Sequence, residues 1–264
     1  MTAAGKTKVE FELAMPNARL WDTEDPYLYT LRAAITENGI EKDSDEMVFG
    51  VRVFEMDAEQ GLRLNGRPMK LRGGCIHHDH GLLGAADYPA ACRRKLTLLK
   101  KAGFNAVRIA HNPPSLNLLL ICGSETQVLN FYKSWKATLE NNHVIGDFTW
   151  TAYDNLGEAG MGKYLWERDG RVEGIGIAAY PWRACYQGDF DLCGYRRPQS
   201  YFREAVWIGG TEPRIFTTHP EHYGEGFTGT GWHWRDVQDS RTFGDAYIGK
   251  PVPCEVYTDA DEIV

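Results

Sequence analysis

The sequence predicts an α/β fold with β-rich segments at both ends, and two observations carry this prediction. From Met69 to Trp207, strand-type runs alternate with amphipathic helical segments, and such alternation implies a parallel sheet covered by helices. Before that stretch, residues 7–56 consist mainly of β-rich runs and turn residues. The chain has 264 residues, which is enough for one large domain or for two ordinary ones.

The N-terminal segment predicts short strands joined by tight turns. Alternating apolar residues at 9–13 and β-rich runs at 27–35 and 47–54 indicate three strands, with the polar run EKDSDE as a connection. The dipeptides Asn38-Gly39 and Asn65-Gly66 favour two-residue hairpin turns. Because about three strands do not complete a β-sandwich, this segment is expected to be the last part of one.

The central segment predicts strands and helices in alternation. Strands are expected in MKLRGGCIHH, FNAVRIAH and HVIGDFTWTAY, and also at Leu118 to Cys122. The first helix is expected to have Asp87 as its N-cap and to end at Gly103, and the last is PQSYFREAVW. A middle helix places Leu129, Tyr132, Trp135 and Leu139 on one side. After Trp207 the chain turns irregular, and PVPCEVYTDADEIV is expected to be a first strand of another β domain.

Composition excludes several classes of partner. A net charge of -7 argues against a surface for nucleic acid or for an anionic membrane, and no apolar run approaches membrane-spanning length. The N-terminus lacks the apolar core of a signal peptide, and the six cysteines show no pairing pattern. The chain as it stands therefore predicts a cytoplasmic location, with Cys75, Cys92 and Cys122 as buried free thiols. Eight tryptophans suit either a sugar-binding surface or a filled core.

Glu125 is the strongest candidate for a catalytic side chain. It lies in ICGSET, directly after the apolar run Leu118 to Cys122 and before an amphipathic helix. In a β/α barrel, the carboxyl ends of the strands present catalytic side chains, so a glutamate there is a candidate nucleophile or general acid. The alternative is a solvated loop residue or a helix-capping group. Glu158, in NLGEAG, is the best remaining candidate for a second carboxylate, and its alternative role is structural.

The run His77-His78-Asp79-His80, together with His111, has the composition of a metal site. Zinc sites need three or four ligands with defined geometry. The simpler interpretation is that His77 and His111 line a pocket and that the other residues belong to a loop. We therefore expect neither a metal nor any other cofactor.

Long motifs resemble glycoside hydrolase family 2, the β-galactosidase-like family. They are FGVRVFEMDAEQGLRLNGRPMKLRGGCIHHDHGLLGA, NAVRIAHNPPS, ICGSET, GDFTWTAYDNLGEAG and YPWRACYQGDFDLCGYRRPQSYFREAVW. The resemblance implies a partial (β/α)8 barrel of the TIM type, with strands resembling the first, second, seventh and eighth, and β-sandwich remnants at both ends. It implies domains at 1–58 (immunoglobulin-like sandwich part), 59–207 (incomplete barrel) and 208–264 (linker and first strand of a further sandwich).

The resemblance also implies roles for five residues. Glu125 matches the nucleophile of a retaining mechanism. His77 and His111 match positions that contact substrate hydroxyls, and Arg108 matches an arginine that orients the nucleophile carboxylate and would lower its pKa. Trp150 matches a ring that lies against the sugar. From the residues alone, a buried ion pair for Arg108 and a core position for Trp150 are the alternatives.

The same resemblance reveals a gap. A complete barrel takes about 250 residues, and the stretch from Met69 to Trp207 is far shorter. The few residues between HNPPS and ICGSET cannot hold four strands with their helices, and the family's acid/base glutamate has no counterpart. The sequence therefore predicts an internally deleted, truncated fragment. Two functions compete: a β-galactosidase-type O-glycosyl hydrolase acting on a β-galactoside-like carbohydrate, and a silent remnant that binds sugar weakly. Open strand edges also predict self-association.

Overall fold

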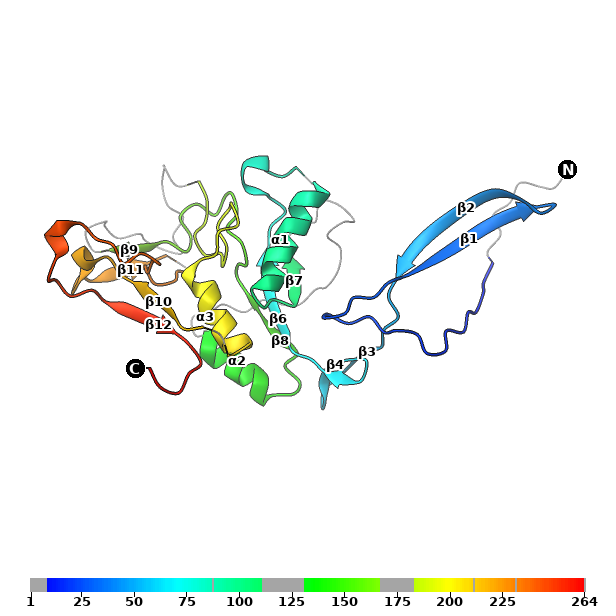
Figure 1. The fold of residues 1–264 in the computed structure, drawn as a ribbon, viewed down its shortest axis with the longest axis horizontal. Coiled ribbons are helices and arrows are strands. Elements are labelled where there is room, and N and C mark those ends of the chain that lie inside the picture. The colour runs from blue at the N-terminus through cyan, green and yellow to red at the C-terminus, as the bar shows by residue number, and fades with distance from the viewer. Residues whose placement is uncertain are drawn as a thin grey trace. The chain divides into compact units, whose positions relative to one another are not determined.

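The computed structural model describes residues 9–86, 88–110, 131–166, 183–210, 212–230 and 232–263 (Figure 1). The chain divides into two compact units, Met1–Met69 and Lys70–Val264. Among the helices of these described residues, none combines the length and the hydropathy that crossing a bilayer requires.

The N-terminal unit is built from hairpins. Strand β1 (Tyr29–Glu37) pairs antiparallel with β2 (Ile40–Phe49), and the turn between them is Asn38-Gly39, both with positive φ (+52° and +78°). The predicted turn is confirmed, whereas the treatment of EKDSDE as a connection is wrong, because that run lies within β2. Its side chains are exposed, so the strand needs no apolar alternation, and Arg32 forms ion pairs with Glu41 and with Glu46 across the hairpin.

A second hairpin follows in the same unit. Strands β3 (Phe54–Asp57), β4 (Gly61–Leu64) and β5 (Arg67–Pro68) form an antiparallel sheet. The predicted turn at Asn65-Gly66 is confirmed, with φ values of +53° and +78°. The strand expected at residues 9–13 is not formed; Phe11 is 87% exposed there, so the alternation buries nothing.

The second unit is organised around a parallel sheet in which β6 (Leu71–Ile76) is the middle strand. Its neighbours are β7 (Ala106–Ile109) and β8 (Gly146–Thr149). The resemblance described above makes the strand after Met69 the first of a barrel, which adjoins both the second and the eighth, and the observed order has this arrangement. The strand expected at 118–122 lies outside the described residues. The α/β class is therefore correct for this unit.

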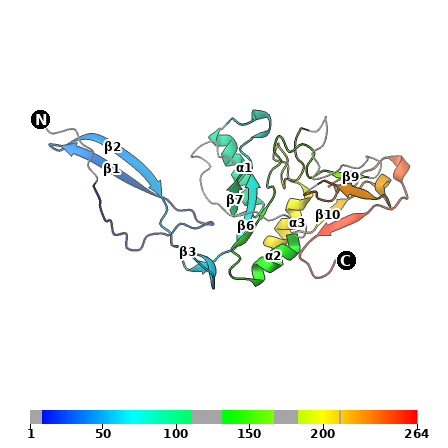
Figure 2. The same ribbon diagram turned by 180° about the vertical axis from the view of Figure 1, so that it is seen from behind.

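Three helices of the described residues pack with this sheet: α1 (Pro89–Lys101), α2 (Phe131–Glu140) and α3 (Pro198–Trp207). Both views show α1 beside β6 and β7 (Figures 1 and 2). Helices α1 and α3 begin with proline, which fits the first helical position. The N-cap of α1 is Tyr88, without a side-chain capping bond, while the predicted cap Asp87 lies outside the described residues. Gly103 follows the helix with φ of +91°, as its predicted end.

The core of this unit is aromatic. Phe104 and Trp135 both meet the ring of Trp207 edge to face, at centroid distances of 4.8 and 6.0 Å. Trp135 is buried as the helical pattern predicted, but Leu139 of the same helix is 56% exposed. The buried face of α2 instead runs through Trp135 and Thr138. The helical period predicted for this segment was therefore right, but the buried face of α2 is narrower than the predicted apolar face.

The segment after Trp207 is more regular than the sequence indicated. Strand β9 (Tyr164–Trp166) pairs with β11 (Phe227–Gly229), and β10 (Arg214–Thr217) pairs with β12 (Cys254–Tyr257). Short 3-10 turns lie at Gly81–Leu83, Pro220–His222 and Asp245–Tyr247. The strand expected near the end of the sequence, β12, therefore pairs with another strand. Its Tyr257 packs with Phe216 of β10 and with Phe202 of α3. These strands are too short to show a period in the sequence.

Glycine in the middle strand permits close packing above the sheet. A Cβ at Gly74 would lie 2.5 Å from the Ala152 Cβ and 2.8 Å from a ring carbon of Phe104. We predict that Gly74→Ala lowers the free energy of unfolding by about 1–3 kcal/mol through overpacking. Urea unfolding followed by tryptophan fluorescence measures this. Gly244→Ala is the control, because its Cβ would meet no atom within 4 Å. Equal stability of both variants would contradict the prediction.

Candidate functional site

Two of the predicted site residues meet at the carboxyl edge of the parallel sheet. His77 directly follows β6 and Trp150 directly follows β8, and the parallel pairing of these strands places both residues at one edge. Their rings are in edge-to-face contact, with centroids 5.4 Å apart and an interplanar angle of 73°. Both side chains are half-buried. We call this pair the His77–Trp150 platform.

Arg108 lies on the neighbouring strand β7, where it pairs in register with Cys75 of β6. Its guanidinium Nη1 is 3.8 Å from the Cys75 Sγ, and the side chain is half-buried. Glu125 and His111, the other predicted site residues, lie outside the described residues. The structure therefore brings together three of the five residues on three adjacent strands. Whether Arg108 orients the Glu125 carboxylate stays a prediction.

A buried lysine holds the loop that carries His77. Lys95 of α1 is only 7% exposed, and its Nζ donates hydrogen bonds to the backbone carbonyls of His77, at 3.3 Å, and of Asp79. Its cation also lies 5.0 Å from the ring centroid of Tyr153, whose hydroxyl donates to the Lys95 carbonyl. Burial lowers the pKa of Lys95. The sequence contained a signal for this role, because Lys95 follows Cys92 by three residues and precedes Leu99 by four, on the buried face of α1.

The loops after β6 and β8 are also tied to each other directly. The Leu156 backbone N–H donates to the Asp79 Oδ2 at 2.7 Å. His80 turns toward helix α1, where its Nε2 lies 3.4 Å from the Cys92 Sγ. Within the described ranges, no group of three or more His, Cys, Asp or Glu side chains is arranged to hold a metal ion. Of this run, His77 belongs to the platform, Asp79 accepts the Leu156 N–H and His80 lies against Cys92.

A buried carboxylate fixes the far end of the loop after β8. Asp154 accepts a hydrogen bond from the Gly188 backbone N–H at 2.8 Å and forms an ion pair with Arg197. Burial raises the pKa of Asp154 to about 7, against the opposing effects of the Arg197 guanidinium and the Gly188 N–H. This side chain was not singled out from the sequence, since a single aspartate after a strand carries no periodic signal.

Glu158 has a structural partner in the described residues. Its Oε2 accepts a hydrogen bond from the Gln187 Nε2 at 2.7 Å, and its backbone has a φ of +40°. A non-glycine residue in this conformation is uncommon and indicates a turn set by its surroundings. This arrangement fits the structural role that was the alternative for Glu158.

The platform suits a ligand with both an apolar face and hydroxyl groups. A tryptophan ring can stack on the apolar face of a pyranose, and an imidazole can donate to or accept from a hydroxyl. A sugar combines these two properties. Hydrogen bonds from Lys95 and to Asp79 restrict the loops that carry the ring and the imidazole, which lowers the entropic cost of binding.

Comparisons with known proteins show the family to which the chain belongs. Residues 1–52 match the family model for glycosyl hydrolases family 2, and residues 55–128 match the TIM barrel domain of that family. The beta-galactosidase BoGH2A of Bacteroides ovatus is 43% identical over 111 residues, which are 42% of this chain. A putative beta-glucuronidase of Formosa agariphila is 40% identical over 106 residues, 40% of this chain. The chain therefore belongs to glycoside hydrolase family 2, and it matches only part of the length of its relatives.

The extent of the match differs between sequence and structure. The aligned stretches span 13% of the length of each of these two curated relatives. A solved family 2 member from Bacteroides cellulosilyticus superimposes with a TM-score of 0.75 and 26% identity, over 91% of this chain and 47% of the other. The structural similarity thus continues well beyond the segment that the family models match.

Lys95 provides a test of how the platform is supported. We predict that Lys95→Met destabilises the chain by about 1–3 kcal/mol, because two loop carbonyls lose a donor while the aliphatic stem is kept. Urea unfolding measures the loss. The control is Lys101→Met, an exposed lysine on the same helix. A Lys95→Met chain as stable as the control would show that the ammonium group does not hold the loop.

Asp154 provides a test with a defined sign. Its folded-state pKa of about 7 exceeds the ordinary 3.8, so the folded chain binds more protons between those values. The contribution of the protonated carboxyl to stability is complete below about pH 4 and is lost as the pH rises through about 7. We predict that between pH 5 and 8 the wild type loses about 2.5 kcal/mol relative to Asp154→Asn. Denaturant unfolding at several pH values measures this, and a difference independent of pH would contradict it.

Proposed function

We propose that this chain derives from a retaining O-glycosyl hydrolase of β-galactosidase type and that it lacks steady catalytic turnover. The observation that carries the proposal is the His77–Trp150 platform at the carboxyl edge of a parallel sheet, with Arg108 on the adjacent strand. Catalytic side chains of β/α barrels occupy this edge. The motifs around these three residues resemble those of the family, and His77 and Arg108 lie within residues 55–128, which match its TIM barrel model.

The chain is proposed to lack turnover because one of the two carboxyl groups that the reaction needs is missing. Retaining glycosidases need two carboxyl groups about 5–5.5 Å apart, one as nucleophile and one as acid and then base. In this proposal Glu125 is the nucleophile, His111 contacts a substrate hydroxyl, and the acid/base glutamate is absent from the sequence. Glu158 does not replace it, because its carboxylate is engaged by Gln187.

An internal deletion explains the missing acid/base residue. In a closed eight-stranded barrel the first strand is flanked by the second and the eighth, and β6 is flanked in this way by β7 and β8. We therefore assign β6, β7 and β8 to the first, second and eighth barrel strands and the run before Glu125 to the seventh. The proposed domains are residues 1–58, 59–207 and 208–264.

The substrate class of the parent is proposed as β-galactosides. The relatives include proteins named beta-galactosidase and others named beta-glucuronidase. The segment GYRRPQS stands where glucuronidases of the family carry an asparagine and a lysine, which favours a neutral sugar. Weak carbohydrate binding without any chemistry is the second candidate function, because the platform needs no carboxylate to stack on a sugar ring.

Self-association is a further part of this proposal. The hairpin β1–β2 is exposed along nearly its whole length, with Ile35 66% and Met47 60% exposed. An isolated two-stranded hairpin is marginal in water, and exposed apolar strands promote pairing with other chains. We infer that the purified chain associates rather than remaining a monomer.

The chemistry gives a direct test. With a nitrophenyl β-galactoside, which needs the general acid least, we predict at most a burst of product without turnover, and no hydrolysis of lactose. General acid–base assistance contributes about 10²–10⁴-fold, so its loss also leaves the glycosyl-enzyme unreleased. Stopped-flow absorbance measures the burst. Glu125→Gln should abolish it and Glu158→Gln should not. Steady lactose hydrolysis by the purified chain would refute the proposal.

A further inference from the structure

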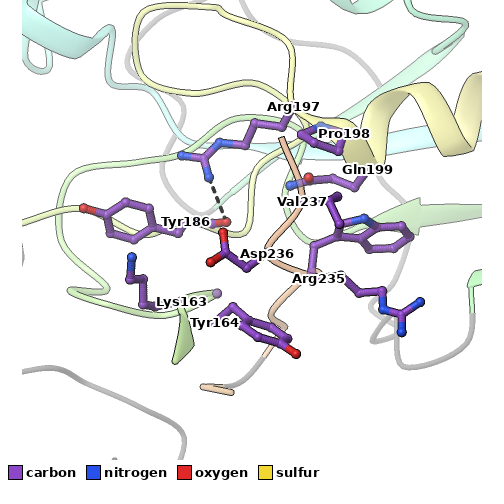
Figure 3. Close-up of a pocket in the computed structure, with 11 residues that line it drawn as sticks. Lys163, Tyr164, Tyr186, Arg197, Pro198, Gln199, Arg235, Asp236 and Val237 are labelled. Carbon is purple, nitrogen blue, oxygen red and sulfur yellow. Dashed lines mark hydrogen bonds between the residues drawn. The ribbon is translucent and has the colours of Figure 1, made fainter. Parts of the chain in front are cut away.

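A small pocket lies in the C-terminal half of the second unit, apart from the residues of the platform. Its volume is about 120 Å³, and its lining comes from β9, from the chain around Tyr186 and Arg197, and from residues 234–237 (Figure 3). None of His77, Arg108 and Trp150 lines it. Pockets for drug-sized ligands measure about 300–1,000 Å³, so this pocket suits a single small ring.

The pocket is lined by a tyrosine ring that other rings hold in place. Tyr164 stacks on Phe227 with centroids 4.5 Å apart and an angle of 17°, and it meets Trp166 edge-on at 5.0 Å. A second tyrosine of the lining, Tyr186, has the Lys163 ammonium and the Arg197 guanidinium over its ring, each 5.5 Å from its centroid. A fixed ring such as Tyr164 can bind the apolar face of a sugar without losing side-chain freedom.

Asp236 supplies an oriented acceptor. Its Oδ2 accepts a hydrogen bond from the Trp166 Nε1 at 2.8 Å, which fixes the carboxylate. Figure 3 shows Asp236 among the residues that line the pocket, near Tyr164, Tyr186 and Lys163. A carboxylate can accept from two adjacent hydroxyls, whereas a nearby ammonium can donate to the ring substituents. This set of groups matches a polyol.

The charges around the pocket compensate one another. Arg197 is paired with Asp154, and Arg235 is paired with Glu255 at 2.7 Å. Lys163 and Asp236 contribute one charge of each sign to the lining. An anionic ligand would gain little Coulombic attraction here and would meet the Asp236 carboxylate, so the lining favours a neutral ligand over a carboxylate or a phosphate.

We propose that this pocket is a second carbohydrate site, which takes one neutral pyranose unit and is independent of the His77–Trp150 platform. It involves no chemical step and does not rest on the proposed hydrolase ancestry. The Tyr164 ring carries the apolar contact, and Asp236 and Lys163 carry the hydroxyl contacts. A chain with two such sites would hold an oligosaccharide at two points.

The experiment is a titration of the full chain with methyl β-galactopyranoside, followed by saturation-transfer NMR. The variant Asp236→Asn keeps the size of the side chain and an oxygen for the Trp166 N–H, but removes the charge. We expect it to weaken binding about tenfold in a Trp150→Ala background, because one charge-assisted acceptor is lost. The matched control is Asp239→Asn, an exposed carboxylate three residues away that does not line the pocket.

Each outcome decides the proposal. Binding that survives Trp150→Ala, weakens with Asp236→Asn and is unchanged by Asp239→Asn supports a second site. No saturation transfer in the Trp150→Ala background, or equal binding by both aspartate variants, overturns it. Tighter binding of the anionic methyl β-galacturonide than of the galactoside overturns the assignment to a neutral sugar. The hydrolase proposal is tested separately, by the burst of product from the nitrophenyl β-galactoside and by its loss in Glu125→Gln.

Discussion

The pairing of β6 with a parallel strand on each side is the constraint on which the candidate site depends. Parallel strands all end at the same edge of a sheet, so residues that directly follow β6 and β8 become neighbours although they lie far apart in the sequence. His77 and Trp150 meet for this reason. Gly73 and Gly74 in β6 make room for the Phe148 and Phe104 rings, which lie closer to the strand than any side chain would allow.

Charged side chains hold the loops that follow the strands of this sheet. Lys95, Asp79 and Asp154 each form a hydrogen bond with a backbone group of a loop. In the interior, Arg203 and Asp189 form an ion pair with 2.8 Å between Nε and Oδ2. A buried ion pair adds little net stability, because the desolvation of both ions offsets their attraction. Removing one partner leaves the other charge unpaired, however, so such pairs fix one loop conformation strongly. The platform is therefore held by polar contacts as well as by apolar packing.

Aromatic packing joins the C-terminal strands to this frame. Tyr257 of β12 and Phe216 of β10 meet Phe202 and Tyr201 of α3, so the final strand belongs to the same compact unit as the sheet. Trp166 both stacks on His222 at 4.1 Å and donates to Asp236. The aromatic richness noted in the composition thus has two uses here, in a packed interface and around a pocket. Composition alone could not separate these uses.

The sequence by itself determined the local elements and the family. Proline at the start of α1 and α3, glycine after α1 and the Asn-Gly pairs fix backbone angles through short-range sterics, so they are predictable without a fold. The order of β7, β6 and β8 followed from the family's motifs. Tertiary structure alone decided that β12 pairs with β10 and which loop carbonyls the Lys95 ammonium group meets. Both depend on partners outside the local pattern, which carries no information about where such partners lie.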